Sequence, residues 1–280
     1  GLGMSATDGM SLRCEGLGFS YEEAGVPIPA LRDVGVELPA GRSLALLGAS
    51  GSGKSTLLQL IKGLDAPETG RVVLDGCAPD SPGYAGLQRE VGIVFQAPEL
   101  QLFATSAWED VAFGPRRLGR EEAEVRRAVD EAMALVGLPP EEFAARHPYA
   151  LSGGEQRRLA LAGVLAMQPR LLLLDEPFVS LDPATRRQLT AVCSRLRASG
   201  VTLVLATHDV DIAWTLCDDL LVLEEGRVLA SGVWDAEGSG RALRSTPRLR
   251  EPFLVALWRR LGRDPAKAPR THAEAAEALR

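Results

Sequence analysis

The chain has 280 residues, of which 46% are hydrophobic and 24% charged, enough for one large domain or for one domain with an appended piece. Its net charge of −6 argues against general nucleic-acid binding, which requires a basic surface. The four cysteines are far apart and form no Cys-x-x-Cys pair, which indicates reduced thiols in a cytosolic protein rather than a disulfide framework or a zinc site. No apolar run approaches the roughly 20 residues of a membrane span, and no charged start leads into an apolar core as in a signal peptide.

The first third of the chain is predicted to be rich in strands. Short apolar runs bounded by glycine and proline predict strands over residues 11–21, 31–38, 44–47, 70–75 and 91–95. A Gly/Pro-rich turn is expected between the first two strands. After the third, we expect a helix over about residues 54–63, ended by Gly63.

Between about residues 104 and 168 the pattern changes to helix. Residues 121–136 place their apolar side chains on one helical face, begin with glutamates and end before Gly137, as the helix dipole and capping preferences require. Core packing is sufficient to explain that face, so no separate function is assigned to it.

From Arg170 onward the strand pattern returns. Strands are expected over 171–174 and 201–206, separated by a helix that begins at Asp182 and Pro183, and a closing hairpin is expected over 220–223 and 227–230. This alternation predicts an α/β fold with a mostly parallel sheet, interrupted by the helical block.

The stretch from Leu44 to Thr56 is the most informative in the chain. An apolar strand runs into a glycine-rich loop that matches G-x-x-x-x-G-K-[ST] and opens a helix. Such a loop wraps its backbone N–H groups around a polyphosphate, while Lys54 supplies a positive charge and the Ser55 hydroxyl is placed to ligate Mg²⁺. The residues predicted to bind a nucleoside triphosphate here are Gly48, Ala49, Ser50, Gly51, Ser52, Gly53, Lys54, Ser55 and Thr56.

Two acids follow the buried strand over residues 171–174. Asp175 is predicted to hold Mg²⁺, directly or through water, and Glu176 to polarise the attacking water. Paired acids at the end of a buried strand are costly unless a cation is present, which favours the functional interpretation.

A second candidate for anion binding is the stretch Leu151-Ser152-Gly153-Gly154-Glu155-Gln156. Ser152 is a suitable N-cap, and two glycines at a helix start form a nest for an anion. Two such sites far apart in one chain are hard to reconcile with one nucleotide in a monomer. They are natural if Ser152, Gly153 and Gly154 cover the nucleotide of a partner subunit.

Taken in order, these motifs resemble those of ABC-type ATPase domains. The stretch Leu151–Gln156 matches the signature motif of that family. The resemblance covers about residues 11–235. It implies a P-loop NTPase core of the RecA-like type with an N-terminal antiparallel β-subdomain and an inserted α-helical subdomain. It also implies ATP and Mg²⁺ as cofactors and a sandwich dimer with two ATPs between the subunits.

The same resemblance assigns further residues. Gln96 resembles the Q-loop glutamine, which reaches Mg²⁺ and the attacking water, and Asp182 belongs to a stretch resembling the D-loop, which crosses the dimer seam. His208 resembles the switch histidine, which contacts the γ-phosphate. Tyr21 resembles the aromatic residue that stacks on adenine, although simple packing explains an aromatic residue at a strand end equally well.

The region after Gln96 is similar to that of energy-coupling-factor transporter ATPases, which import vitamins or transition metals. In ABC importers it forms the groove for the membrane partner, and the groove residues expected here are Gln101, Leu102, Phe103 and Phe113. The alternative is that the apolar members are only core of the helical subdomain. Ala97 and Leu100 depart from that subfamily's pattern, as does the Ala49-Ser50 pair in the P-loop.

These observations predict an ATP-hydrolysing subunit of a membrane importer, located peripherally at the cytoplasmic face of the membrane. It would pair with a like ATPase, as a homodimer or heterodimer, and bind transmembrane subunits but no nucleic acid. The alternatives are an ATPase of another ABC transporter, for amino acids, lipids or drugs, and a soluble ABC ATPase without a transport role. A non-catalytic binding module is disfavoured by Glu176 and His208.

The expected domain organisation is an ATPase domain over residues 11–240, with the helical insertion at about 104–168, and a helical extension over 241–280. In the extension, an amphipathic helix is expected over residues 247–262, with Phe253, Leu254, Leu257, Trp258 and Leu261 on one face. Thr271 and Glu274 have the spacing of a capping box for a last short helix. The apolar face is expected either to dock on its own domain or to form a dimer contact.

Overall fold

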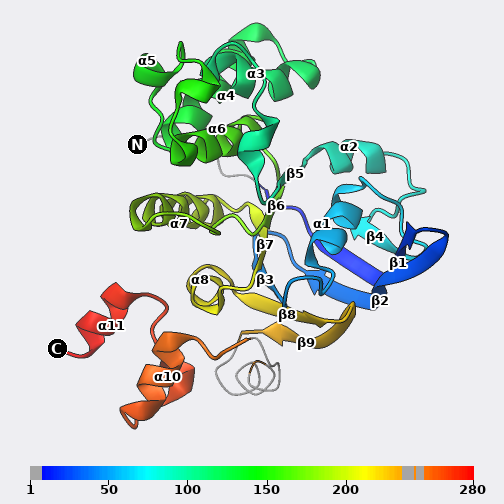
Figure 1. The fold of residues 1–280 in the computed structure, drawn as a ribbon, viewed down its shortest axis with the longest axis vertical. Helices are drawn as coiled ribbons and strands as arrows, with labels where there is room; N and C mark the ends of the chain where they lie inside the picture. The colour runs from blue at the N-terminus through cyan, green and yellow to red at the C-terminus, as the bar shows by residue number, and fades with distance from the viewer. Residues whose placement is uncertain (1–7, 235–242, 244–248) are drawn as a thin grey trace.

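The computed structural model describes residues 8–234, 243 and 249–280 and contains two sheets (Figure 1). The strands are β1 (Leu12–Glu23), β2 (Val26–Leu38), β3 (Ser43–Leu47), β4 (Thr69–Leu74), β5 (Val91–Val94), β6 (Leu171–Asp175), β7 (Thr202–Thr207), β8 (Asp219–Glu224) and β9 (Arg227–Val233). A small antiparallel sheet has the order β2-β1-β4, and a six-stranded sheet has the order β5-β6-β7-β3-β8-β9. All pairings in the larger sheet are parallel except that of β8 with β9.

Helices connect and cover these strands. The α-helices are α1 (Lys54–Lys62), α2 (Tyr84–Arg89), α3 (Ala107–Arg117), α4 (Glu122–Leu135), α5 (Pro140–Phe143), α6 (Gly153–Leu165), α7 (Pro183–Ala198), α8 (Val210–Leu216), α10 (Phe253–Arg260) and α11 (His272–Ala278). The 3₁₀ helices are η1 (Pro98–Gln101), η2 (Pro148–Ala150) and η3 (Pro265–Lys267). The predicted fold class, a mostly parallel α/β core with an antiparallel β-subdomain and an inserted helical subdomain, is confirmed.

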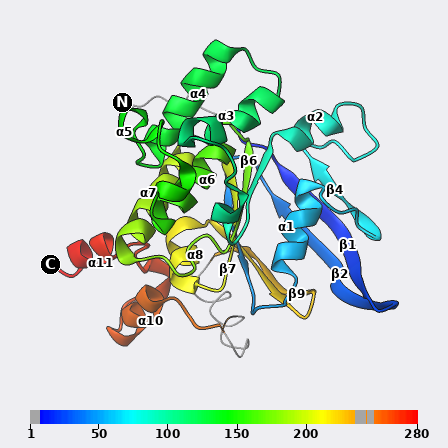
Figure 2. The same ribbon diagram turned by 45° about the horizontal axis from the view of Figure 1, so that its top comes forward.

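The central strands β3, β6 and β7 are buried along their whole length, as expected for parallel strands covered on both faces. Alternate residues belong to two separate cores. Leu44, Leu46 and their neighbours on one face pack with α1 and the small sheet. Ala45 and Leu47 face the other side, where α7, α8 and the helical subdomain supply the core. Figure 2 shows α1 beside the small sheet and the helices α3 to α6 grouped away from it.

The expected Gly/Pro-rich turn between the first two strands is much shorter than predicted. The β1–β2 hairpin turns at Ala24 and Gly25, both with positive φ, 51° and 78°. Pro27 and Pro29 lie inside β2. Because β2 is an edge strand of its sheet, prolines without an N–H group are tolerated there.

Two short helices, α2 and α8, were not predicted. They have six and seven residues, too few turns for a periodic apolar pattern to stand out. The sequence does carry a signal for α8, because Asp209 is its N-cap and accepts hydrogen bonds from the backbone N–H groups of Asp211 and Ile212.

The C-terminal helices dock on α8 of their own chain. The Trp214 indole donates a hydrogen bond to the Pro269 carbonyl (2.9 Å), and the Arg270 guanidinium lies 3.8 Å from the centroid of the Trp214 ring. The predicted apolar face of α10 is only partly correct, since Trp258 is buried but Phe253 and Leu261 are half exposed. The dimer-contact alternative stays a prediction.

The capping box that begins α11 is confirmed. The expected boundary between residues 240 and 241 and the first residues of the predicted 247–262 helix lie outside the described residues, and the domain limits stay a prediction.

Candidate nucleotide-binding site

The glycine-rich loop joins the buried strand β3 to α1 as predicted. Gly53 is the N-cap of α1 with φ 104°, a left-handed backbone conformation that L side chains rarely adopt. A Cβ atom on Gly48 would lie 2.6 Å from the carbonyl oxygen of Leu223. Both glycines are therefore required by backbone geometry, and the loop presents the N-terminal end of α1 to a phosphate-sized ligand.

Lys54 extends from the first residue of α1 back across the loop. Its side chain is only 7% exposed, and its ammonium group donates hydrogen bonds to the carbonyl oxygens of Gly48 (2.8 Å) and Ala49 (3.1 Å). The same group lies 3.6 Å from the Glu176 carboxylate. These acceptors hold a buried positive charge at the place where the sequence predicts the outer phosphates.

Asp175 ends β6 and is only 6% exposed. Burial raises the pKa of its carboxyl group, and the neighbouring Glu176 raises it further, while a hydrogen bond with Ser55 and the charge of Lys54 oppose the shift. The Oδ1 atom of Asp175 is buried without a hydrogen-bond partner. An unpaired carboxylate oxygen beside a serine hydroxyl suits Mg²⁺, which prefers oxygen ligands.

No group of three or more His, Cys, Asp and Glu side chains that could hold a metal occurs in the described part of the chain. A Mg²⁺ site of few protein ligands, completed by water and phosphate oxygens, does not need such a group.

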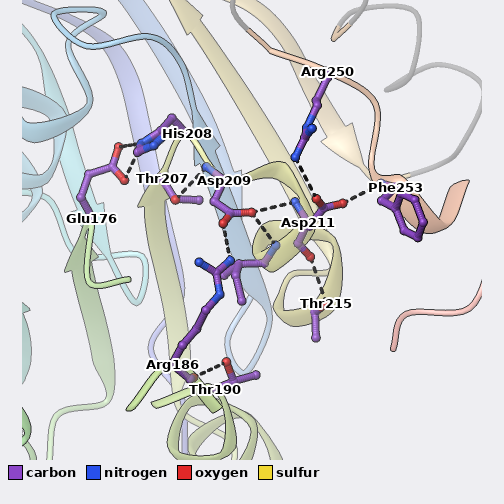
Figure 3. A network of polar contacts seen from close by, with 11 residues as sticks. Glu176, Arg186, Thr190, Thr207, His208, Asp209, Asp211, Thr215, Arg250 and Phe253 are labelled. Carbon is purple, nitrogen blue, oxygen red and sulfur yellow. Dashed lines mark hydrogen bonds and ion pairs between the residues drawn. The ribbon is translucent and has the colours of Figure 1, made fainter. Parts of the chain in front are cut away.

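Glu176 and His208 meet at the ends of neighbouring strands, β6 and β7. His208 Nδ1 lies 3.0 Å from each Glu176 carboxylate oxygen (Figure 3). Glu176 is 12% exposed and His208 61% exposed. The general base and the switch histidine predicted from the sequence are thus in direct contact.

The loop that carries His208 is fixed by the next residue. Asp209 caps α8 and pairs with Arg186 of α7 (Figure 3). Although burial works against ionisation of Asp209, the Arg186 guanidinium and two backbone N–H groups lower its pKa. Asp211, two residues later, accepts a hydrogen bond from the Phe253 N–H group (2.6 Å), which attaches the C-terminal extension to the same helix.

A cavity of about 420 Å³ opens above these groups, within the usual range for ligand pockets. It is lined by Tyr21, Ile28, Pro29, Ala30, Ser50, Gly51, Gly53, Lys54, Ser55, Thr56, Gln96, Asp175, Glu176, Val179 and His208. Six of the nine predicted loop residues, Gln96, both acids and the histidine therefore come together from four separate parts of the sequence. Gly48, Ala49 and Ser52 do not line the cavity.

Sequence reasoning missed part of this lining. Ile28, Pro29 and Ala30 enter the cavity from β2, and Ile28 is the cross-strand partner of Tyr21. The sequence predicted a turn between residues 21 and 31, so the pairing of Ile28 with Tyr21 was not predicted. Val179 was also missed.

Tyr21 lies at the rim of the cavity and is 44% exposed. Its hydroxyl group lies 3.0 Å from Thr56 Oγ1 and donates to Gln59 Oε1 at 3.1 Å, and its ring packs edge-on against Phe19. Both the packing role and the adenine-stacking role agree with this position, so stacking stays a prediction.

The signature residues Ser152, Gly153 and Gly154 do not line the cavity, and neither does Asp182. Ser152 caps α6, as predicted, and the structure adds a capping box with Glu155. Asp182 caps α7, and a Cβ atom on Gly154 would lie 2.9 Å from Thr185 Oγ1 of the same helix. These residues form one unit at the start of α6 and α7, separate from the nucleotide cavity of their own chain.

The expected membrane-partner groove is exposed only in part. Phe103 and Phe113 are 61% and 49% exposed and pack edge to face, with ring centroids 4.9 Å apart. Gln101 is exposed as well. The side chain of Leu102 is 3% exposed and belongs to the core, so its assignment to a partner-facing surface is wrong. The burial of Leu102 agrees with the alternative interpretation, in which this residue belongs to the core of the helical subdomain.

Comparison with known proteins agrees with this geometry. Residues 31–179 match the ABC transporter family. The energy-coupling factor transporter ATP-binding protein EcfA2 of Methanospirillum hungatei is 39% identical over 245 residues, which cover 87% of this chain and 61% of that protein. The cobalt import ATP-binding protein CbiO of Rhodobacter capsulatus is 44% identical over 232 residues, 82% of each chain.

Solved structures show the same fold. The cbiO1 protein from Clostridium perfringens, described as part of the ABC transporter complex cbiONQ, has a TM-score of 0.70 and 36% identity, covering 79% of this chain and 88% of that one. The ATP-binding cassette MJ0796, in a dimeric post-hydrolysis state with ADP and Pi, has a TM-score of 0.71 and 29% identity over 79% and 98%. The chain therefore belongs to the ABC transporter family, in which it is an ATP-hydrolysing subunit.

Proposed function

We propose that this chain is the energy-coupling ATPase of a membrane importer of the energy-coupling-factor type, which takes up a vitamin or a transition-metal ion. One observation carries the proposal most directly. Gln96 lines the nucleotide cavity, and a few residues later the same segment exposes Phe103 beside Phe113. A single short segment therefore joins the site of hydrolysis to an apolar surface suited to a protein partner. The names of the relatives from Methanospirillum and Rhodobacter support the transporter type.

In this proposal the cavity binds ATP through the P-loop. Lys54 carries the positive charge for the outer phosphates, and residues 48–56 supply backbone N–H groups. Ser55, Asp175 and Gln96 would hold Mg²⁺, which neutralises the charge on the phosphate oxygens when bound. The unpaired Oδ1 of Asp175 supports this assignment.

Hydrolysis converts ATP and water to ADP and phosphate. Glu176 accepts a hydrogen bond from the attacking water and aligns it, and His208 orients Glu176 through their 3.0 Å contact. The Asp209–Arg186 pair holds the loop that carries the histidine. Tyr21 supplies an aromatic surface at the rim for the adenine base.

The site is completed by a second ATPase subunit, identical or similar. Ser152, Gly153, Gly154 and Asp182 of that subunit would close over the nucleotide, since these residues do not reach the cavity of their own chain. The dimeric MJ0796 cassette with ADP and Pi supports this arrangement. Closure on ATP and opening after hydrolysis would move the attached membrane subunits.

Peripheral attachment at the cytoplasmic face of the membrane completes the proposal. None of the described helices is long and apolar enough to cross a bilayer, and the exposed aromatic pair offers a contact with a transmembrane partner.

The partner surface is tested by Phe103→Asp and Phe113→Asp. Each places a charge in an exposed apolar contact, so we expect loss of co-purification with transmembrane subunits from detergent-solubilised membranes while the isolated chain still hydrolyses ATP. Phe253→Asp is the matched control, because Phe253 is 55% exposed but lies in the C-terminal extension. Unchanged complex formation with both variants would refute the surface assignment. If the unmodified chain co-purified instead with the transmembrane subunits of an importer that uses a periplasmic binding protein, the alternative, an ATPase of another ABC importer class, would be favoured.

A further inference from the structure

Arg157, in the second turn of α6, bridges two segments that belong to different parts of the proposed mechanism. Its Nε and Nη2 atoms donate to the Glu99 carboxylate at 3.2 and 3.4 Å. Its Nη1 atom donates to the carbonyl oxygen of Val179 at 2.5 Å. We propose that Arg157 is a positioning residue that couples the segment of residues 97–104, beside the partner surface, to the segment of residues 176–182, beside the nucleotide. This inference rests on the function proposed above and names a residue that would transmit its signal.

The bridge is more than a surface ion pair. Arg157 and Glu99 are each only 23% exposed. A guanidinium has a planar set of donors, so one side chain can hold a carboxylate and a carbonyl oxygen at fixed relative positions. Partial burial reduces solvent screening of the pair compared with a fully exposed one.

The acceptor at the nucleotide end lies in a strained segment. Glu176 and Ser180 both adopt positive φ, 48° and 58°, although neither is glycine. Val179 lies between them and lines the nucleotide cavity. A positive φ is strained in residues other than glycine and persists only where the surroundings hold it. The hydrogen bond from Arg157 to the Val179 carbonyl is one such restraint, placed three residues after Glu176.

The acceptor at the other end lies in η1. Glu99 precedes Leu100, whose side chain is 83% exposed, and the segment continues to the exposed Phe103. A partner that moves this segment therefore moves the carboxylate held by Arg157. Because α6 begins at the signature glycines, the same side chain also ties the signature helix to both segments.

Coupling of this kind is reciprocal, so it is measurable without a membrane partner. If the bridge transmits the state of the nucleotide site, nucleotide binding must alter the stability of residues 97–104. Their backbone N–H groups are good reporters, since Leu100 and Leu102 bond within η1 and Phe103 and Ala104 donate to Asp110.

The test is amide hydrogen exchange of the full-length chain with and without Mg²⁺ and a non-hydrolysable ATP analogue. In the unmodified chain we expect the nucleotide to protect residues 48–56 and to change the exchange rate of residues 97–104 by about fivefold or more. In Arg157→Gln the protection of 48–56 should persist, while the change at 97–104 falls below about twofold. Glu99→Gln, which retains the Val179 contact, should lose the response in the same way. Arg157→Lys should not restore it, because one ammonium cannot replace the planar fork.

Arg42→Gln is the matched control. Arg42 makes a two-point ion pair with Asp219 at 2.7 and 2.8 Å, next to the end of β3 opposite the P-loop. Its loss should lower stability without changing the nucleotide response at 97–104.

An unmodified chain whose residues 97–104 ignore the nucleotide would overturn the inference, and so would an Arg157→Gln or Arg157→Lys variant with the full response. Failure of the analogue to protect residues 48–56 would instead overturn the nucleotide site itself. Since no membrane protein is present, a negative result here is distinguishable from failure of the importer proposal, which the Phe103 and Phe113 variants test.

Discussion

Replacement of Asp175 by asparagine should stabilise the protein in the absence of Mg²⁺ and nucleotide. The carboxyl group is 6% exposed, its Oδ1 atom has no hydrogen-bond partner, and the Glu176 carboxylate adds like-charge repulsion. Asparagine removes the buried charge, retains an oxygen that can accept from Ser55 and adds an N–H group that can donate to Glu176. The side chain needed for Mg²⁺ is therefore expected to cost stability in the free protein.

The magnitude follows from the burial of one unpaired polar atom, which costs roughly 1–3 kcal/mol. Hydrogen bonding by asparagine recovers part of this, so we expect the free energy of unfolding to rise by about 1–2 kcal/mol. For domains of 150–250 residues each kcal/mol shifts Tm by roughly 2–4 °C. Thermal unfolding in EDTA should accordingly show a higher Tm for the variant.

The pH dependence gives an independent check with a defined sign. The pKa of Asp175 is raised in the folded state, mainly by burial. Below its unfolded-state pKa the group is neutral in both states and costs nothing. Between the unfolded-state and the folded-state pKa only the unfolded chain ionises readily, so the cost to stability grows with pH and is full above the folded-state pKa. The stability advantage of Asp175→Asn should therefore be full near neutral pH and shrink on acidification.

Mg²⁺ and ATP should reverse the order of stabilities. A ligand at 100 times its Kd raises the free energy of unfolding of the protein that binds it by about 2.7 kcal/mol. The unmodified chain has the Asp175 carboxylate for Mg²⁺, whereas the Asp175→Asn variant lacks it. The reasoning would be refuted if Asp175→Asn were no more stable than the unmodified chain in EDTA at pH 7, or if acidification widened the difference.

Three further substitutions test other parts of the site. Glu176→Gln should still bind ATP but hydrolyse it at least about a hundredfold more slowly, the range for lost general-base assistance, and should accumulate an ATP-bound dimer on gel filtration; normal turnover would exclude Glu176 as the base. Lys54→Ala should weaken ATP binding by roughly 10- to 100-fold, because charge-assisted hydrogen bonds to phosphate are lost, and equal affinity by calorimetry would contradict the role of Lys54. Asp182→Ala removes a cap that accepts from the N–H groups of Ala184 and Thr185 (2.8 and 3.1 Å) and should lower the midpoint of denaturant unfolding; an unchanged midpoint would contradict a stabilising role for this cap.

Local patterns in the sequence determined much of this protein. The strand, glycine-rich loop and helix around Lys54 were predicted in the correct order, because each depends on neighbouring residues. The N-caps Ser152 and Asp182 were likewise readable from side chains that bond within three residues. The apolar run over 171–174 predicted a buried parallel strand, which β6 confirms.

Tertiary structure alone decided which of these parts meet. The 3.0 Å contact between Glu176 and His208 depends on the pairing of β6 with β7, and no local pattern determines strand order. For the same reason, the sequence did not indicate that residues 28–30 of β2 line the cavity. Phe103 is exposed and Leu102 is buried because of how this segment packs against the helical subdomain. Both side chains are apolar, so the sequence does not indicate which of them faces solvent.

The bridge through Arg157 illustrates the difference most directly. Its partners, Glu99 and Val179, lie 58 and 22 residues away, and in the sequence Arg157 is one more charge on a helix. The spacing of residues in the glycine-rich loop determined that this chain would bind a nucleoside triphosphate, because phosphate chemistry requires particular residues next to one another. How that site connects to the rest of the molecule was decided only by folding, because those contacts join residues that the chain itself keeps far apart.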